Sequence, residues 1–153
     1  MANTFTQIHI QLVFATKFRQ ALISERWENR LFEYITAIIQ NHKHKVLAIN
    51  GMPDHIHILV GFRPNQALSD LVREIKNSST NWINEEGLTT YKFAWQEGYS
   101  GFSYTKSHIP QVITYIQNQK KHHEKVNFLD EYVKILESLE IDYNPAYIFS
   151  EPK

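Results

Sequence analysis

One stretch constrains the fold of this 153-residue chain more than any other: residues 53–60, which read Pro-Asp-His-Ile-His-Ile-Leu-Val. The Pro-Asp pair favours a turn, and the β-branched residues after it favour a strand. Because successive side chains of a strand point to opposite faces, His55 and His57 would share one face, and Ile56 and Ile58 the other. Two steps of about 3.3 Å separate the roots of the imidazoles by about 6.6 Å, so both rings can converge on one cation. The stretch therefore predicts a strand with one apolar face and one face able to bind a metal ion.

The rest of the chain alternates between strand and helix periodicity. Apolar residues alternate where strands are predicted and recur every three or four residues where helices are predicted. Asn50-Gly51 predicts the turn between the two central strands. Predicted helix N-caps are Ser24, Ser107 and Asn127. The predicted elements are a strand over 6–14, a helix over 25–42, strands over 45–49 and 54–62, a helix over 67–85, short strands over 93–97 and 102–105, a helix from 107 to about 123 and a helix from 127 to about 140.

The order β-α-β-β-α-β with a hairpin in the middle is typical of an α+β fold. We expect a ferredoxin-like or RRM-like antiparallel sheet with helices packed on one face, plus a C-terminal helical tail. Residues 1–123 form the body in this interpretation, and 124–153 form an acidic helical tail of the same domain.

Composition indicates an ordinary soluble globular protein, with 42% hydrophobic and 21% charged residues. The chain has no cysteine, which excludes disulfides and cysteine-based zinc sites. No secretory signal and no membrane-spanning stretch are visible, so we expect a cytoplasmic protein with no membrane partner. The net charge is zero, but residues 1–123 carry 13 Lys and Arg against 9 Asp and Glu, whereas the tail carries 3 against 7. A mildly basic body permits a polyanionic partner without requiring one.

Two short motifs are candidates for chemistry, and each is weak alone. His55 and His57 can be metal ligands or two histidines on the outer face of an ordinary strand. Tyr115 and Gln119 lie four residues apart, so they share one helical face, where a tyrosine can act as a nucleophile and an amide oxygen as a ligand. The ordinary alternative is a core tyrosine beside a surface amide.

The other histidine pairs give less indication of a site. His42 and His44 flank a helix-to-strand junction, and we interpret them as solvated surface. His122 and His123 are adjacent at a helix end and cannot share one helical face, so we expect them to stabilise the helix C-terminus or to contact phosphate. Asp54 faces away from His55 in a regular strand, which favours a turn role over metal ligation.

Together, in this order of strands and helices, the motifs resemble the single-tyrosine transposases of the HUH endonuclease superfamily, of the IS200-like type. These are small enzymes that move insertion sequences as single-stranded DNA. The segments that carry the resemblance are the strand and basic exit 13–19, the histidine strand 53–60, the helix 68–76 with Ser78-Ser79, the closing section 95–99 and the tyrosine helix 115–119. The resemblance fades after about His123.

The resemblance implies that residues 1–123 are the catalytic domain of a DNA transposase. Tyr115 would attack a phosphodiester and form a 5′-phosphotyrosine, and His55, His57 and Gln119 would hold one divalent metal ion, Mg²⁺ or Mn²⁺. The expected partner is single-stranded DNA with hairpin ends. A homodimer is also implied, in which the tyrosine helix of one subunit completes the site of the other, and the protein would associate with the nucleoid when it is bound to DNA.

Basic and aromatic side chains are candidates for DNA contacts, although each is as readily an ordinary surface or core residue. The basic candidates are Lys17, Arg19, Arg73, Lys76, Lys120 and Lys121. The aromatic candidates for base stacking are Tyr91, Phe93, Trp95, Tyr99 and Tyr104.

Three alternative functions stay open. One is a domesticated HUH nuclease that acts on repeated hairpins or replication origins. Another is a non-catalytic module that binds single-stranded nucleic acid. The third is a metal phosphoesterase without a covalent step, although the paired His-x-Thr/Ser motifs of one such class are missing from the sequence.

Overall fold

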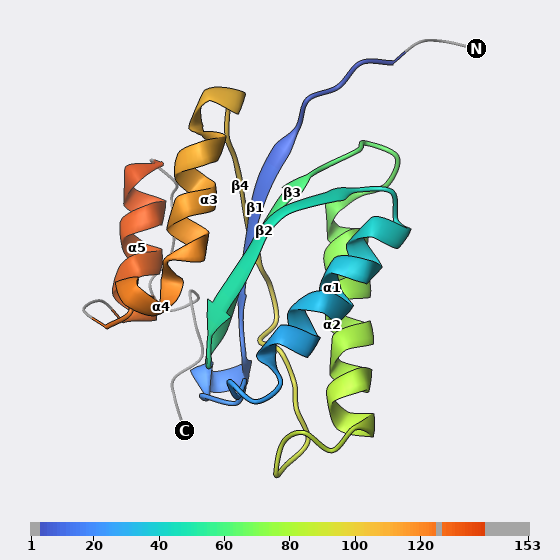
Figure 1. Cartoon of the computed structure of the whole chain (residues 1–153), viewed down its shortest axis with the longest axis vertical. Helices are drawn as coiled ribbons and strands as arrows, with labels where there is room; N and C mark the ends of the chain where they lie inside the picture. Colours follow the sequence, from blue (N-terminus) through green and yellow to red (C-terminus); the bar gives the residue numbers. More distant parts are fainter. Residues whose placement is uncertain (1–3, 125–126, 140–153) are drawn as a thin grey trace.

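The computed structural model describes residues 4–124 and 127–139, which are built around one four-stranded antiparallel sheet. The strand order is β2-β3-β1-β4 (Figure 1). The strands are β1 (His9–Ala15), β2 (Lys45–Met52), β3 (His55–Gly61) and β4 (Ser100–Ser103). β3 lies between β1 and β2, so the histidine strand is central, as its unbroken run of buried residues requires.

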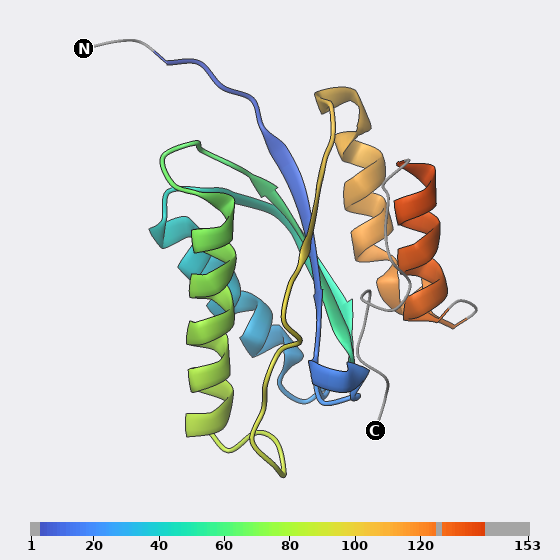
Figure 2. The same cartoon turned by 180° about the vertical axis from the view of Figure 1, so that it is seen from behind.

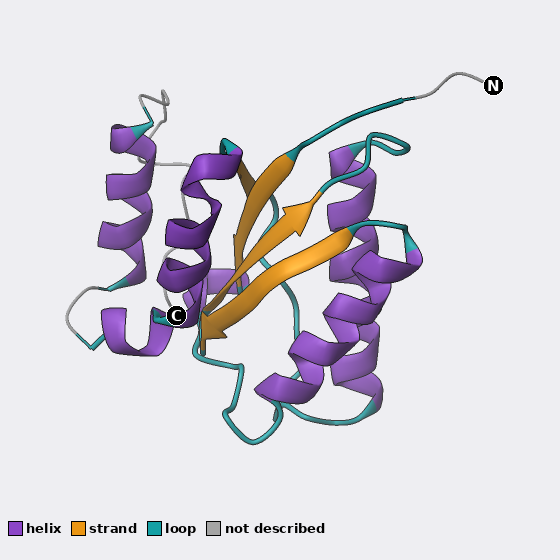
Figure 3. Cartoon of the chain, turned by 45° about the horizontal axis from the view of Figure 1, so that its top comes forward, coloured by secondary structure: helices purple, strands orange, loops and turns teal. Residues whose placement is uncertain are grey.

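Helices cover both faces of the sheet (Figures 1 and 2). Helices α1 (Glu28–Asn41) and α2 (Leu68–Glu85) lie on one face. On the other face lie α3 (Ile109–Gln117), α4 (Gln119–His122) and α5 (Phe128–Ser138). Figure 3 shows the sheet between these two layers, and two short 3-10 helices, η1 (Lys17–Arg19) and η2 (Lys106–His108), follow β1 and β4. The predicted α+β antiparallel architecture is confirmed, and the three C-terminal helices cover the face to which no helix was assigned.

The main core lies between the sheet and α1 and α2. Ile56, Ile58 and Val60 point into it from β3, and Leu12 and Phe14 point into it from β1. This is the alternation that the sequence predicts. Each of these side chains is 2% exposed or less, and burying one aliphatic side chain contributes about 1.5–3 kcal/mol.

The opposite face has two smaller apolar clusters. In the first, Leu59 packs against α3 through Val112 and Ile116. The second joins α5 to the sheet, with Phe128 and Leu136 against β1 and β4. The acidic tail therefore packs on the sheet as far as it is described.

The turn between β2 and β3 lies later than predicted. Asn50 and Gly51 belong to β2, where they pair with His57 and Ile56, and the chain reverses at Pro53. Asn50 uses its side chain to donate hydrogen bonds to α3, and a Cβ on Gly51 would lie 2.4 Å from the carbonyl oxygen of His55. Neither residue forms a turn. Asn50 instead bonds β2 to α3 through its side chain, and Gly51 allows the backbones of β2 and β3 to approach closely.

Other predicted boundaries also move. Residues 93–97 form only an isolated bridge, between Thr16 and Trp95, in place of a strand. The helix predicted from 107 breaks at Asn118 into α3 and α4. Neither Ser24 nor Ser107 directly precedes its helix, because α1 begins after Trp27 and α3 after His108, although the Ser24 hydroxyl does accept from the backbone amide of Arg26 at 3.2 Å. Asn127 does cap α5, where its side chain accepts from the backbone amide of Asp130 at 2.9 Å.

No helix among the described residues is both long enough and apolar enough to cross a bilayer.

Candidate active site

The two histidines of β3 are fully buried and share the sheet face that α3, α4 and α5 cover, because His55 contacts Gln119 of α4 and His57 contacts Glu131 of α5. Their ring centroids lie 5.1 Å apart. Asp54 Oδ1 lies 2.7 Å from Nδ1 of His55, and Gln11 Nε2 lies 2.8 Å from Nδ1 of His57. Because both Nδ1 atoms have partners on the sheet side, both Nε2 atoms point toward the helices. The sheet thus presents two oriented nitrogens, which is what a metal ion needs.

Helices α3 and α4 bring the tyrosine and the glutamine to these histidines. The ring of Tyr115 lies 5.8 Å from that of His57, edge to face, and Gln119 Oε1 lies 3.1 Å from Nε2 of His55. The break at Asn118 is held to β2 by Asn50, whose side-chain amide donates to two carbonyl oxygens at the end of α3, at 3.0 and 3.2 Å. All four predicted site residues meet within one chain. Completion of the site by a partner subunit stays a prediction.

Glu131 of α5 is the site residue that the sequence reasoning missed. It is 3% exposed, and its carboxylate lies at the centre of the cluster. Oε1 lies 3.2 Å from Nε2 of His57 and 3.1 Å from Nε2 of His123, and Oε2 accepts from Gln119 Nε2 at 3.0 Å. Oε2 also accepts a hydrogen bond from the hydroxyl of Tyr115.

A sequence signal for Glu131 does exist. It lies three residues after Phe128 and four before Ile135, so it occupies the stripe of α5 that packs on the sheet. Phe128 stacks on the ring of His55, with centroids 3.7 Å apart. An acidic residue on the buried stripe of an amphipathic helix is unusual, because charged side chains are rarely buried without partners.

The electrostatics of the cluster favour a bound cation. Burial lowers the pKa of His57 to about 4, even though its hydrogen bond to Glu131 works in the other direction. Burial alone would raise the pKa of Glu131, but hydrogen bonds from His123 and His57 outweigh it and hold that pKa well below its ordinary value. Burial and the neighbouring carboxylate raise the pKa of Tyr115. At neutral pH the buried carboxylate of Glu131 therefore lies beside the neutral imidazole of His57 and the neutral phenol of Tyr115.

The donor set fits a divalent metal ion. Nε2 of His55, Nε2 of His57 and a carboxylate oxygen of Glu131 lie within 4.8 Å of one another, and Gln119 Oε1 adds a neutral oxygen next to His55. Two nitrogens and two oxygens suit Mn²⁺ well and Mg²⁺ less well.

Behind His57, Gln11 links Nδ1 of His57, the nitrogen that faces away from the metal-binding position, to Tyr104, whose hydroxyl donates to Gln11 Oε1 at 2.9 Å. With the Gln11 amide in this orientation, its Nε2 donates to Nδ1 of His57, so Nε2 of His57 carries the proton. Turning the Gln11 amide over reverses both hydrogen bonds, because an amide presents a donor and an acceptor of similar shape. Nδ1 then donates, and Nε2 of His57 is left with a lone pair for a metal ion.

Two of the lysines predicted to contact DNA are used within the protein. Lys76 donates to the carbonyl oxygens of Gln96, at 2.8 Å, and Gly98, and burial lowers its pKa to about 8. Lys120 donates to Glu28 at 3.0 Å and to Asn50 at 3.3 Å. Both ammonium groups therefore stabilise contacts between elements.

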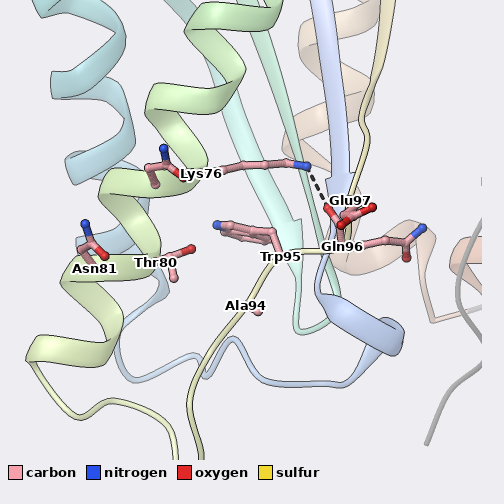
Figure 4. A pocket seen from close by; sticks show the side chains of 8 residues that line it. Lys76, Thr80, Asn81, Ala94, Trp95, Gln96 and Glu97 are labelled. Carbon is pink, nitrogen blue, oxygen red and sulfur yellow. Dashed lines mark hydrogen bonds between the residues drawn. The ribbon is translucent and has the colours of Figure 1, made fainter.

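Lys76 also lines an open cleft of about 390 Å³ between α2 and the segment before β4 (Figure 4). Trp95 forms part of the wall, and its indole nitrogen donates to Ser79 at 2.9 Å. Metal-binding groups gather elsewhere, on the face covered by α3, α4 and α5.

The other predicted DNA contacts differ in exposure. Lys17 and Lys121 are exposed and Arg19 is half-buried, whereas Arg73 is exposed and forms an ion pair with Asp70 on the same helix.

Of the aromatic candidates, Tyr91 is 86% exposed, and Phe93 and Trp95 belong to the core. Tyr99 is exposed, and Tyr104 is half-buried against Gln11.

Two predictions about the remaining histidines are wrong. His44 is buried rather than solvated, because it stacks on Phe62 and bonds to Gln66 at 2.7 Å. His122 and His123 both reach Glu131, at 3.2 and 3.1 Å. Both do so from the end of α4, a single turn whose geometry continues through His123, because α5 brings Glu131 against that end.

Comparisons with known proteins agree on one family. The sequence profile described as "Transposase IS200 like" matches residues 4–119. The ISDra2 transposase TnpA of Deinococcus radiodurans is 23% identical over 118 residues, which cover 74% of this chain and 84% of that protein.

Two solved structures share the fold. A crystal structure described as a transposase from Deinococcus radiodurans has a TM-score of 0.62 and 21% identity, over 78% of this chain and 95% of the other. A structure of a REP-associated tyrosine transposase bound to a REP hairpin has a TM-score of 0.62 and 15% identity, over 82% and 74%.

Proposed function

The chain belongs to the IS200-like transposase family, and from this premise we propose that it cleaves and rejoins single-stranded DNA through a covalent bond to Tyr115. The observation that carries the proposal is the position of the Tyr115 hydroxyl. It contacts a buried carboxylate that also lies against both histidines of β3, so nucleophile and metal-binding atoms meet at one point. A phosphate placed there would be reached by both.

The proposed reaction begins with attack by the Tyr115 oxygen on the phosphorus of a phosphodiester. A bond from phosphorus to Tyr115 forms, the bond from phosphorus to the 3′ oxygen breaks, and that oxygen takes up a proton from solvent to become a 3′-hydroxyl. The phenol proton leaves along its hydrogen bond to the Glu131 carboxylate and passes to solvent. The strand is left with a 5′-phosphotyrosine, and the reverse reaction with another 3′-hydroxyl rejoins DNA without ATP.

The side chains around Tyr115 have separate roles in this proposal. His55, His57, Gln119 and Glu131 would hold the divalent ion, which stabilises charge on the phosphate and so lowers the barrier. Asp54 and Gln11 orient the two imidazoles from behind. Phe128 covers the outer face of His55 and excludes water from it. The hydrogen bond to Glu131 also holds the Tyr115 hydroxyl beside the metal-binding atoms.

The substrate, in this proposal, is single-stranded DNA with hairpin ends. The REP-associated relative, which shares the fold, was solved bound to a hairpin. The mildly basic body of residues 1–123 is compatible with a polyanion. We further propose that the catalytic domain, 1–123, works together with the tail, because α5 supplies Glu131, and that the protein acts in the cytoplasm at the nucleoid.

The central experiment is adduct formation. Wild-type protein, incubated with labelled hairpin DNA and Mn²⁺, is expected to carry the label through a denaturing gel. Tyr115→Phe is expected to carry none, whereas Tyr91→Phe, at an exposed tyrosine, is expected to match the wild type. A wild type without adduct, or a Tyr115→Phe protein with one, would exclude the proposed nucleophile.

A second experiment addresses the predicted homodimer with shared sites. Tyr115→Phe protein is mixed with His57→Ala protein, and each is inactive alone in this proposal. Restored cleavage means that the tyrosine of one subunit reaches the histidines of another. A mixture without cleavage means that each chain uses the site that its own helices assemble.

A further inference from the structure

We propose that the active site binds a second divalent cation, held by Nε2 of His122, Nε2 of His123 and the carboxylate of Glu131. Glu131 would bridge this ion to the one at His55 and His57. The proposal deepens the proposed function, but the binding that it predicts does not depend on strand cleavage.

The first observation is the arrangement of nitrogens around one carboxylate. Nε2 of His57 and Nε2 of His123 lie 3.2 and 3.1 Å from Oε1 of Glu131, and Nε2 of His122 lies 3.2 Å from Oε2. The donor atoms form two groups among the described residues, His55-His57-Glu131 and His122-His123-Glu131. Within each group the donor atoms lie within 4.8 Å of one another. A carboxylate shared by two such groups can bridge two ions.

The second observation is the state of His122. Its Nε2 is buried and makes no hydrogen bond to the described part of the chain. Oε2 of Glu131 lies 3.2 Å from it, without hydrogen-bond geometry. A buried polar atom without a partner costs about 1–3 kcal/mol. A cation between the nitrogen and the carboxylate would satisfy both.

The local structure explains how two consecutive histidines can serve one ion. Helix α4 has a single turn that ends at His122, and His123 follows it with helical backbone angles, so the two side chains leave adjacent positions at the end of the helix. Helix α5 then returns beside α4 and places Glu131 between them (Figure 1). Two nitrogens and one carboxylate suit Mn²⁺, Zn²⁺ or Co²⁺ better than Mg²⁺.

The proposed second cation site, at His122 and His123, lies next to Tyr115, the proposed nucleophile. The ring of His122 lies 5.4 Å from that of Tyr115, and both residues contact the same oxygen of Glu131. A cation there would favour loss of the phenol proton, while the first position faces the phosphate. Pairs of ions about 3.5–4 Å apart act in this divided way in many phosphoryl-transfer enzymes.

The test is the number of Mn²⁺ ions bound per chain, measured on the full-length protein by equilibrium dialysis and elemental analysis. The wild type is expected to bind two ions, and the double variant His122→Ala, His123→Ala one. His108→Ala, at an exposed histidine outside the cluster, is the matched control and is expected to keep two. A wild type that binds one ion, or a double variant that still binds two, would overturn the proposal.

Electron paramagnetic resonance gives an independent measurement on the same samples. Two Mn²⁺ ions bridged by a carboxylate are expected to give a spin-coupled spectrum in the wild type, and an isolated-ion spectrum in the double variant. An uncoupled wild-type spectrum at saturating Mn²⁺ would contradict the bridge. Circular dichroism of the double variant, expected to match the wild type, separates loss of a ligand from loss of the fold.

These outcomes are distinguishable from failure of the proposed function. A wild type that binds one ion and forms the Tyr115 adduct would leave the function standing and remove the second ion. A wild type that binds two ions and forms no adduct would support the second ion and remove the nucleophile.

Discussion

The two faces of β3 have opposite roles, although their residues alternate along one strand. Ile56, Ile58 and Val60 enter a single cluster of buried apolar residues beneath α1 and α2. His55 and His57 enter a polar network beneath α3, α4 and α5, where hydrogen bonds and ion pairs join their ring nitrogens to Gln119 and Glu131. Residues on the first face form the hydrophobic core, and residues on the second form the candidate active site.

The difference extends to the rest of each layer. The cluster on the α1 and α2 side is continuous, whereas the apolar residues on the other side divide into two clusters, one around Leu59 and one around Phe128. The buried donors and acceptors of the site lie on this side. On the α1 and α2 side, substitutions should therefore change the free energy of unfolding according to the side-chain volume that they remove. On the α3, α4 and α5 side, they should change how stability depends on pH and how tightly metal ions bind.

The largest expected effect compares neighbouring residues on the two faces. Ile58→Ala and Leu59→Ala both truncate fully buried side chains of β3. Such truncations cost about 2–5 kcal/mol of unfolding free energy. We expect Ile58→Ala toward the upper end, because it lies in the continuous core, and Leu59→Ala toward the lower end. Urea denaturation measures both, and the reverse order would mean that the α3 side contributes more to stability than its smaller clusters indicate.

The next effect is a pH dependence that belongs to the polar face alone. In the metal-free protein the pKa of His57 is lowered to about 4, because burial disfavours its charged form. Below its ordinary value of 6.5 the unfolded chain therefore takes up a proton that the folded chain does not. Stability from this group is complete above pH 6.5 and is lost as the pH falls toward 4, by at most about 3 kcal/mol.

Urea denaturation in the presence of EDTA, repeated between pH 7 and pH 4, measures this loss. Glu131, whose pKa is also lowered, adds a loss of the same sign at lower pH. His57→Gln is expected to flatten the upper part of the profile, whereas Ile58→Ala should shift the whole profile without changing its slope. A slope that His57→Gln leaves unchanged would assign the pH dependence to other groups.

The smallest expected effect is a loss of metal affinity when Gln11, which orients the ring of His57, is replaced. Gln11→Leu removes the partner of Nδ1 of His57 and leaves Tyr104 without its acceptor. Loss of such a partner typically weakens metal affinity 10- to 100-fold, or about 1.4–2.7 kcal/mol. Calorimetric titration with Mn²⁺ measures the change, and Gln117→Leu, at an exposed glutamine, is the control. Unchanged affinity in Gln11→Leu would mean that packing alone orients His57.

Much of the fold could be predicted from the sequence because it depends on local periodicity. The alternation over β3 assigned its residues to the correct faces, and three- and four-residue spacing located α1, α2 and α5 to within a few residues. Predictions that rested on a single dipeptide or cap were weaker. Asn50-Gly51 is a common turn sequence, yet here the bonds from Asn50 to α3 and the close approach of Gly51 keep both residues in β2.

The candidate site, like the fold, was predicted from the sequence only where local spacing identifies its residues. His55, His57, Tyr115 and Gln119 were predicted from the spacings within one strand and one helix together with the family resemblance, and the structure brings the four together. The buried His44 was interpreted as surface, because its contacts with Phe62 and Gln66 come from residues far along the chain.

The sequence alone thus determined the alternation of β3, the short spacing that keeps Tyr115 and Gln119 together, and the family. Only the tertiary structure decided that Glu131 of the acidic tail lies among four histidines. The physical reason is distance along the chain. Periodicity reports which side of its own element a residue occupies, whereas the meeting of Glu131 with His57, 74 residues earlier, depends on how α5 packs against the sheet.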